Sequence, residues 1–193
     1  MRQLTRDDLL SLERYAAERV QFRARAIAHK RARTLHLGAH ATLLFEDRLT
    51  VQYQVQEMLR VERIFEAAGI DGELEAYNPL VPDGRNLKAT LLFEYPDEAE
   101  RRRELAALGG IEHRFFAQID GSGRIAAHAD EDLDRSIDDK TSAVHFLRFE
   151  FARDAIAALR AGAPLSFGID DPRMPLCASI GEPLRGALLA DFD

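Results

Sequence analysis

The stretch RLTVQYQVQEMLRVERIFEAAG, residues 48–69, predicts a long helix in the middle of the chain. Its apolar residues recur at about 100° per residue, which is the spacing of a helix packed against a core. The residues on this apolar face are Val51, Val55, Met58 and Phe65. Glu62 falls among them. We expect a largely buried helix at about residues 50–68, packed on two sides, that carries a carboxylate inside its apolar arc.

The polar side of this helix is narrow. It consists of Gln52, Gln56, Arg60 and Arg63, and the polar residues inside the apolar arc are Gln54, Glu57 and Glu62. An isolated carboxylate removed from water costs several kcal/mol unless it is paired, protonated or bound to a metal. Arg60 lies three positions from Glu57, whereas no cation lies three or four positions from Glu62. The partner of Glu62 is therefore expected from another part of the fold.

Histidines on predicted strands are the candidate partners of Glu62. In AVHFLRFEF, residues 143–151, strict alternation places His145 on the same face as three apolar residues, so we expect it to face the core. His36 and His40 share one face of a second strand-like segment. His145 can then bind Glu62 or a backbone carbonyl as a purely structural residue, ligate a metal, or take part in acid–base catalysis.

A metal site is the most specific of these alternatives. Imidazole nitrogens combined with a carboxylate suit iron, manganese or zinc. The candidate ligands are His40, Glu62 and His145, with Glu57 or Glu66 as a further ligand or as a residue that orients one.

Strands and helices surround the middle helix without the regular rhythm of a parallel sheet. Residues 5 to about 31 predict a long N-terminal helix capped by Thr5. LKATLLFEY, residues 87–95, predicts a strand, and DGSG, residues 120–123, predicts the turn of a hairpin. The polar residues on the solvated face of the strand are Lys88, Thr90 and Glu94.

The length and composition suit one compact domain. The chain has 193 residues, of which 46% are hydrophobic and 31% are charged, as in ordinary globular proteins. We expect a single α+β domain over residues 1–193. It would consist of an N-terminal helix at 1–33 and, over 34–193, a single mixed or antiparallel sheet covered by helices.

The charge and cysteine content limit the function. A net charge of -7 argues against a protein that coats nucleic acids or anionic membranes. Cys177 is the single cysteine, so we expect a buried, inert thiol in the reducing cytoplasm, with no disulfide and no cysteine cluster for a metal. The N-terminus lacks an apolar signal region, and no apolar run approaches the ~20 residues that span a bilayer.

Three further segments are candidate interaction sites. GELEAYNPLVPDGRN, residues 72–86, predicts a loop that can act as a lid, with Tyr77 and Asn78 contacting a small ligand. The basic segment 19–33 suits the C-terminal end of a helix and is also able to bind an anionic partner such as RNA. Residues 130–139 predict an acidic loop that begins like a calcium-binding loop but lacks its glycine and its final glutamate.

Four stretches together resemble a bacterial family of unknown function, domain-of-unknown-function family 3501. They are LGAHATLLFEDRLTVQYQVQEMLRVERI, ELEAYNPLVP, LKATLLFE and SAVHFLRFEF. The resemblance runs over nearly the whole chain. It implies partners among rubrerythrin-type and iron–sulfur redox proteins, which accompany this family in bacterial gene neighbourhoods. The family pattern includes His40, Glu46, Gln54, Glu57, Met58, Glu62, Tyr77, Asn78 and His145, but it carries over no catalytic role.

The leading hypothesis is a cytoplasmic accessory protein that acts beside redox partners, possessing a His/Glu site for iron, manganese or zinc. A cofactor-free protein–protein interaction module is the first alternative. An enzyme that binds a small ligand under the 72–86 segment is the second. The sequence does not decide whether the protein is an enzyme.

Overall fold

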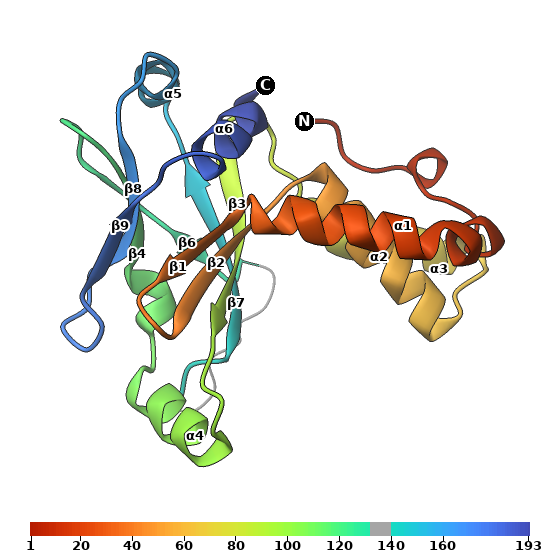
Figure 1. The fold of residues 1–193 in the computed structure, drawn as a ribbon, viewed down its shortest axis with the longest axis horizontal. Coiled ribbons are helices and arrows are strands. Elements are labelled where there is room, and N and C mark those ends of the chain that lie inside the picture. Colours follow the sequence, from red (N-terminus) through yellow and green to blue (C-terminus); the bar gives the residue numbers. More distant parts are fainter. Residues whose placement is uncertain (132–139) are drawn as a thin grey trace.

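The protein folds into two antiparallel sheets and a separate group of helices (Figure 1). The structure is a computed structural model that describes residues 1–131 and 140–193. The predicted α+β class is confirmed. The expectation of a single sheet is wrong, because the strands divide between two sheets that pack face to face.

The first sheet has the strand order β1-β2-β3-β7-β6. Its strands are β1 (Thr34–Leu37), β2 (Ala41–Glu46), β3 (Asn86–Phe93), β7 (Val144–Glu150) and β6 (His128–Ala129). The second sheet has the order β5-β4-β8-β9. Its strands are β5 (Arg124–Ala126), β4 (Phe115–Ile119), β8 (Leu165–Ile169) and β9 (Leu176–Ser179). The hairpin predicted around DGSG is confirmed as β4 and β5.

The main core lies between the two sheets. Phe167 of the second sheet packs against two rings of the first, with centroid distances of 4.8 Å to Phe45 and 5.2 Å to Phe149. In β3 the odd-numbered residues are buried in this core, as strand alternation predicts. The even-numbered residues, Lys88 among them, therefore lie on the outer face of the first sheet, which is the face turned away from the second sheet.

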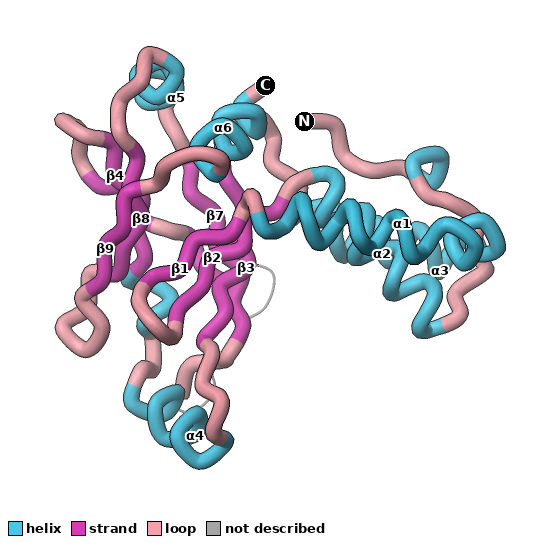
Figure 2. The backbone as a smooth tube through the Cα atoms, in the orientation of Figure 1, coloured by secondary structure: helices cyan, strands magenta, loops and turns pink. Residues whose placement is uncertain are grey.

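Three helices form a second hydrophobic cluster beside the first sheet (Figures 1 and 2). They are α1 (Leu12–Arg31), α2 (Arg48–Glu62) and α3 (Ala67–Tyr77), followed by a 3-10 turn at Asn78–Leu80. We call residues 1–31 and 48–80 the helical lobe. The predicted end of α1 near Arg31 is confirmed, but α1 begins at Leu12 with Ser11 as its cap, and Thr5 caps a separate 3-10 turn.

The remaining helices cover the sandwich. They are α4 (Glu98–Ala107), α5 (Arg153–Arg160) and α6 (Leu184–Leu189), with 3-10 turns at Ile111–Arg114 and Ala190–Phe192. Each of these helices contributes a leucine to the main core: Leu105 from α4, Leu159 from α5 and Leu188 from α6. Figure 1 shows α4 and α5 beyond opposite ends of the strands. None of the helices in the described ranges is long and apolar enough to cross a bilayer.

The middle helix is shorter than predicted, and its burial differs. It ends at Glu62, because Arg63 adopts a left-handed conformation with φ 56° and ψ 46°. Glu62 is exposed, and so are Val61 (61%) and Phe65 (65%). The prediction of a buried Glu62 is wrong. It assumed that one straight helix continues to about residue 68, whereas the helix ends at Glu62.

Part of the polar side of α2 is covered by the N-terminal segment. Gln56 is fully buried, and its Oε1 accepts a hydrogen bond from the backbone N–H of Leu10 at 2.6 Å. Gln52 donates to the backbone carbonyl of Asp8 at 2.5 Å. The side-chain amides therefore fasten the segment before α1 onto α2.

Cys177 is exposed on β9, contrary to the prediction of a buried thiol. β9 is an edge strand, and its residues alternate between half-buried and exposed positions. Cys177 falls on the exposed side.

Candidate functional site

The residues predicted as metal ligands lie in separate parts of the molecule. His145 is buried in the sandwich, whereas Glu62 and Glu66 are exposed between α2 and α3. His40 lies in the β1–β2 turn, where its ring stacks on Tyr95 at 4.3 Å. Within residues 1–131 and 140–193, no group of three or more His, Cys, Asp or Glu side chains is placed to hold a metal ion.

His145 faces the core, as strand alternation predicts, but its partners are not glutamates of α2. Its Nδ1 lies 2.5 Å from Oδ2 of Asp130, and its Nε2 lies 2.7 Å from Oγ1 of Thr141. Thr141 in turn donates to Oε2 of Glu112 at 2.9 Å. Nε2 also lies 3.1 Å from the carbonyl of Ser142. This buried network joins β7 to the turn before β4 and satisfies the ring.

Glu57 is held by side chains of α1 and α2. Arg19 donates two hydrogen bonds to its carboxylate, each of 2.8 Å, and the Tyr15 hydroxyl donates a third at 2.6 Å. Arg60 adds a contact of 3.2 Å. The Arg19 guanidinium is the main cause that lowers the pKa of Glu57 to about 2. The carboxylate is therefore a structural link between two helices.

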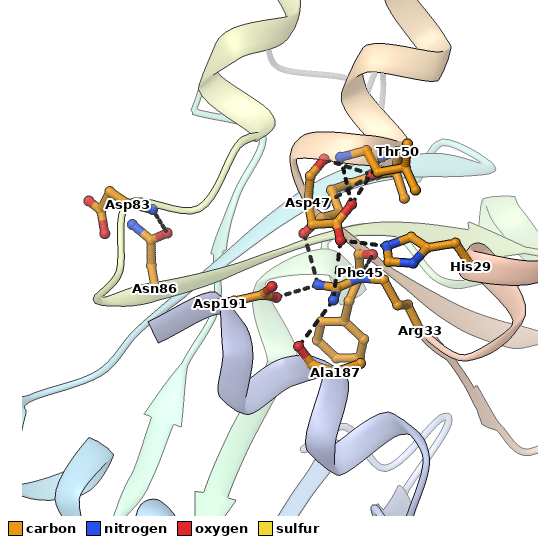
Figure 3. Close-up of polar contacts among 11 residues, drawn as sticks. His29, Arg33, Phe45, Asp47, Thr50, Asp83, Asn86, Ala187 and Asp191 are labelled. Atoms are coloured by element: carbon orange, nitrogen blue, oxygen red, sulfur yellow. Dashed lines mark hydrogen bonds and ion pairs between the residues drawn. The ribbon is translucent and has the colours of Figure 1, made fainter. Parts of the chain in front are cut away.

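Arg33, which was predicted only as part of the basic segment 19–33, is the centre of a buried charged cluster that was not predicted (Figure 3). Its guanidinium donates to the backbone carbonyls of Phe45 (3.0 Å) and Ala187 (3.1 Å) and pairs with Asp191. It also lies 3.5 Å from Asp47, the cap of α2. Burial raises the pKa of Asp191 to about 6. Nothing near Arg33 in the sequence signals this cluster, because Asp191 lies 158 positions away.

A cleft separates the helical lobe from the outer face of the first sheet. It consists of two cavities of about 490 Å³ and 250 Å³ that share Tyr77, Leu80 and Phe146. The helical lobe contributes Lys30, Val51, Gln54, Ala76, Tyr77, Pro79 and Leu80 to its walls. The facing wall is formed by Leu44, Glu46, Lys88, Thr90, Leu92, Glu131, Phe146, Leu147 and Arg148. Small-molecule sites commonly occupy such clefts between two packed units.

Lys88 is the cation at the centre of the sheet wall. In the strand register it lies opposite Glu46 of β2 on one side and opposite Arg148 of β7 on the other. The Glu46 carboxylate accepts hydrogen bonds from the hydroxyls of Thr50 (2.5 Å) and Thr90 (2.6 Å). The strand alternation correctly placed Lys88 on the outer face, but the helical lobe covers this part of the face, so Lys88 is half-buried rather than fully solvated.

Arg148 is already paired with carboxylates. It donates to Glu131 at 2.7 and 2.8 Å and to Glu150 at 2.7 Å. The Lys88 ammonium makes neither a hydrogen bond nor an ion pair with any residue that the structure describes. Burial, followed by the charge of Arg148, lowers the pKa of Lys88. Lys88 is thus a partly desolvated cation without a direct counter-ion in the described chain.

Tyr77 and Asn78 have different roles, although both were predicted to contact a ligand. Tyr77 lines both cavities of the cleft. The Asn78 amide instead clamps the backbone of Leu4, accepting from its N–H at 2.8 Å and donating to its carbonyl at 3.0 Å. The segment predicted as a loop over 72–86 contains the end of α3 and the following 3-10 turn, and it forms part of one wall of the cleft.

The acidic loop predicted at 130–139 falls mostly on residues 132–139, which lie outside the described residues. Its first residue, Asp130, belongs to the His145 network and also accepts a hydrogen bond from the backbone N–H of Phe146 at 3.0 Å.

The comparisons place the chain in a family. Residues 3–192 match a family described as "Protein of unknown function (DUF3501)". The chain belongs to this family. The resemblance seen in the sequence is thereby confirmed. The DUF3501 chain is also 53% identical to a crystal structure of a "novel protein of unknown function" from Burkholderia pseudomallei K96243. The two chains cover 100% of each other with a TM-score of 0.94. A comparison with functionally curated proteins gives no match.

Proposed function

We propose that this DUF3501 protein binds a small anionic molecule in the cleft between the helical lobe and the first sheet. The half-buried Lys88 ammonium carries the proposal, because a partly desolvated charge with no direct counter-ion among the described residues is stabilised when an anion pairs with it. The Tyr77 hydroxyl and the Gln54 amide line the same cleft, and within the described chain neither makes a side-chain hydrogen bond. All three groups can donate to an acceptor-rich ligand.

The remainder of the cleft suits the body of a small organic molecule. Pro79, Leu80 and Phe146 give apolar surface next to Lys88. The larger cavity, at about 490 Å³, lies within the range of ligand pockets. A ligand with an apolar body and one anionic group would place its body against this apolar surface and its anionic group at Lys88.

A thermal-shift screen of small carboxylates and phosphates against the purified chain tests this proposal. A ligand that binds only the folded state raises the melting temperature in proportion to its concentration and affinity. We expect at least one anion to stabilise the parent protein and to lose that effect in Lys88→Met. The variant itself should melt no lower than the parent, because a partly buried charge is removed.

Arg85→Met is the matched control. It removes one positive charge at an exposed position directly before β3, away from the cleft walls. Stabilisation by the anion should survive in Arg85→Met. Equal loss of stabilisation in both variants would show a general charge effect, and a screen in which no anion stabilises the parent would contradict the proposal.

The redox and metal roles stay predictions with less support. The family resemblance implied rubrerythrin-type or iron–sulfur partners, and a small anionic ligand is compatible with such a partnership. The proposed metal set of His40, Glu62, His145, Glu57 and Glu66 is dispersed over the fold. Elemental mass spectrometry on chelator-free protein tests it, and near-stoichiometric iron, manganese or zinc lost in His145→Ala would restore the metal hypothesis.

A further inference from the structure

Lysine is rare in this chain. Only Lys30, Lys88 and Lys140 are lysines among 26 basic residues, and all the others are arginines. Lys30 lies over the Tyr53 ring at 5.6 Å, and Lys140 is exposed. An arginine at position 88 would supply the same charge with more hydrogen-bond donors, but a guanidinium does not become a neutral nucleophile near neutral pH, whereas a lysine amine can.

The surroundings of Lys88 favour its neutral form. Burial among the apolar walls of the cleft acts first, and the cross-strand guanidinium of Arg148 acts in the same direction. The carboxylates of Glu131, Asp83 and Glu150 oppose them, but the net effect lowers the pKa of the amine. Desolvation and a neighbouring cation are the two ways by which proteins convert a lysine into a nucleophile.

We infer that Lys88 forms an imine with a small carbonyl compound that also carries an anionic group, such as a 2-oxo acid or an aldehyde acid. This inference rests on the proposed function, since it assigns the ligand class of the same cleft. The neutral amine attacks the carbonyl carbon, and one proton moves from nitrogen to oxygen to give a carbinolamine. Loss of one water molecule then forms the carbon–nitrogen double bond. No oxidant or reductant is consumed.

Each part of the cleft has a role in this step. Lys88 supplies the nitrogen, and the apolar residues around it reduce the local water that would reverse imine formation. Tyr77 lines the same cavity and carries a hydroxyl that can donate to the carbonyl oxygen. Arg148 lies opposite Lys88 in the strand register and is held in its position by Glu131 and Glu150.

Reductive trapping tests the inference on the full-length protein. The chain is incubated with glyoxylate, reduced with borohydride, and mapped by peptide mass spectrometry. We expect the intact mass to increase by one carboxymethyl group per chain, with the modification on Lys88 in preference to Lys30 and Lys140. Pyridoxal 5′-phosphate, a larger anionic aldehyde, serves as a second probe with the same expected preference.

Lys88→Arg is the matched variant, because it keeps the charge of the cleft and removes the amine. It should fold as the parent does and lose the adduct mapped to position 88. Glycolate, which has the carboxylate of glyoxylate without the aldehyde, should slow trapping at Lys88 and leave Lys140, which lines neither cavity of the cleft, unaffected.

The outcomes separate the two proposals. Equal modification of the three lysines with both probes would overturn the inference. Stabilisation of the parent by glycolate and glyoxylate without any trapped adduct would also overturn it, and would leave anion binding in place. If neither anion stabilises the protein and neither aldehyde prefers Lys88, imine formation fails together with this choice of anion.

Discussion

At the scale of single residues, Glu57 is the most heavily engaged side chain of α2. It accepts hydrogen bonds from Tyr15 and Arg19 on α1. Replacing it with glutamine removes the negative charge that strengthens its hydrogen bonds from Tyr15, Arg19 and Arg60, so we expect Glu57→Gln to lower the free energy of unfolding by about 1–2 kcal/mol, a range reduced for its partial exposure. Urea denaturation followed by circular dichroism measures this change.

The same residue makes a pH-dependent contribution. In the folded protein the pKa of Glu57 is lowered from 4.5 to about 2, so the unfolded chain takes up a proton before the folded one does. Its stabilising contribution is present above pH 4.5 and is lost as the pH falls from there toward 2. Glu57→Gln should flatten the acid limb of the stability curve, whereas Glu75→Gln, at an exposed position on α3, should leave it unchanged. Identical acid limbs for the parent and Glu57→Gln would argue against this role.

The sequence could predict on which face of a strand a side chain lies, but it could not predict which other residues that side chain contacts. Period-two alternation placed His145 in the core and Lys88 on the opposite face of the sheet. Alternation says nothing of what covers a face, so the wall of helices over Lys88 was not foreseen. Glu62 was assigned to the core on the assumption that the helix continues past residue 62. Because α2 ends there, the assignment is wrong.

At the scale of elements, the end of α2 is unusual because a non-glycine residue adopts the left-handed conformation. Arg63 has φ 56°, where a side chain costs roughly 1–2 kcal/mol that glycine avoids. We expect Arg63→Gly to stabilise the protein by about 1 kcal/mol, since part of the gain is offset by the greater freedom of the unfolded chain. The midpoint of urea unfolding reports this change.

Val61→Gly is a control that should change the stability in the opposite direction. Val61 is exposed in the last turn of α2, where glycine loses helix propensity without relieving strain, so this variant should be less stable than the parent. If Arg63→Gly were also less stable, contacts of the Arg63 side chain would outweigh the conformational gain.

The break at Arg63 also explains which elements the sequence could predict. Strands such as β3 and β7 follow a strict alternation, and the β4–β5 turn carries glycines, so these elements were found. The sequence VERIFEAAG has no proline, asparagine or glycine at the break, and its apolar residues continue at helical spacing into α3. The helix was therefore predicted to continue to about residue 68, whereas α2 ends at Glu62 and most of α3 lies in the segment that was predicted as a loop.

At the scale of the whole molecule, the chain has two hydrophobic clusters, one in the sandwich and one in the helical lobe. Arg33 lies between them, directly after α1, and contacts β2, the cap of α2 and the C-terminal helices (Figure 3). Local sequence patterns do not reveal this arrangement, because the ion pair between Arg33 and Asp191 joins residues that are 158 positions apart.

This arrangement predicts that Arg33 couples the unfolding of the two clusters. Arg33→Met leaves the buried Asp191 without its cation, which typically costs about 3–5 kcal/mol. Arg31→Met removes the same charge two positions earlier at an exposed site and should cost less than about 0.5 kcal/mol.

Two probes can follow the clusters separately during urea unfolding. Three of the four tyrosines, Tyr15, Tyr53 and Tyr77, lie in the helical lobe, and the chain has no tryptophan, so tyrosine fluorescence reports mainly on the lobe. Circular dichroism at a strand-sensitive wavelength includes the sandwich. The two transitions should coincide in the parent and in Arg31→Met and separate in Arg33→Met, with the lobe unfolding at lower urea. Coincident transitions in Arg33→Met would mean that packing between the lobe and the first sheet, rather than the charged cluster, holds the two clusters together.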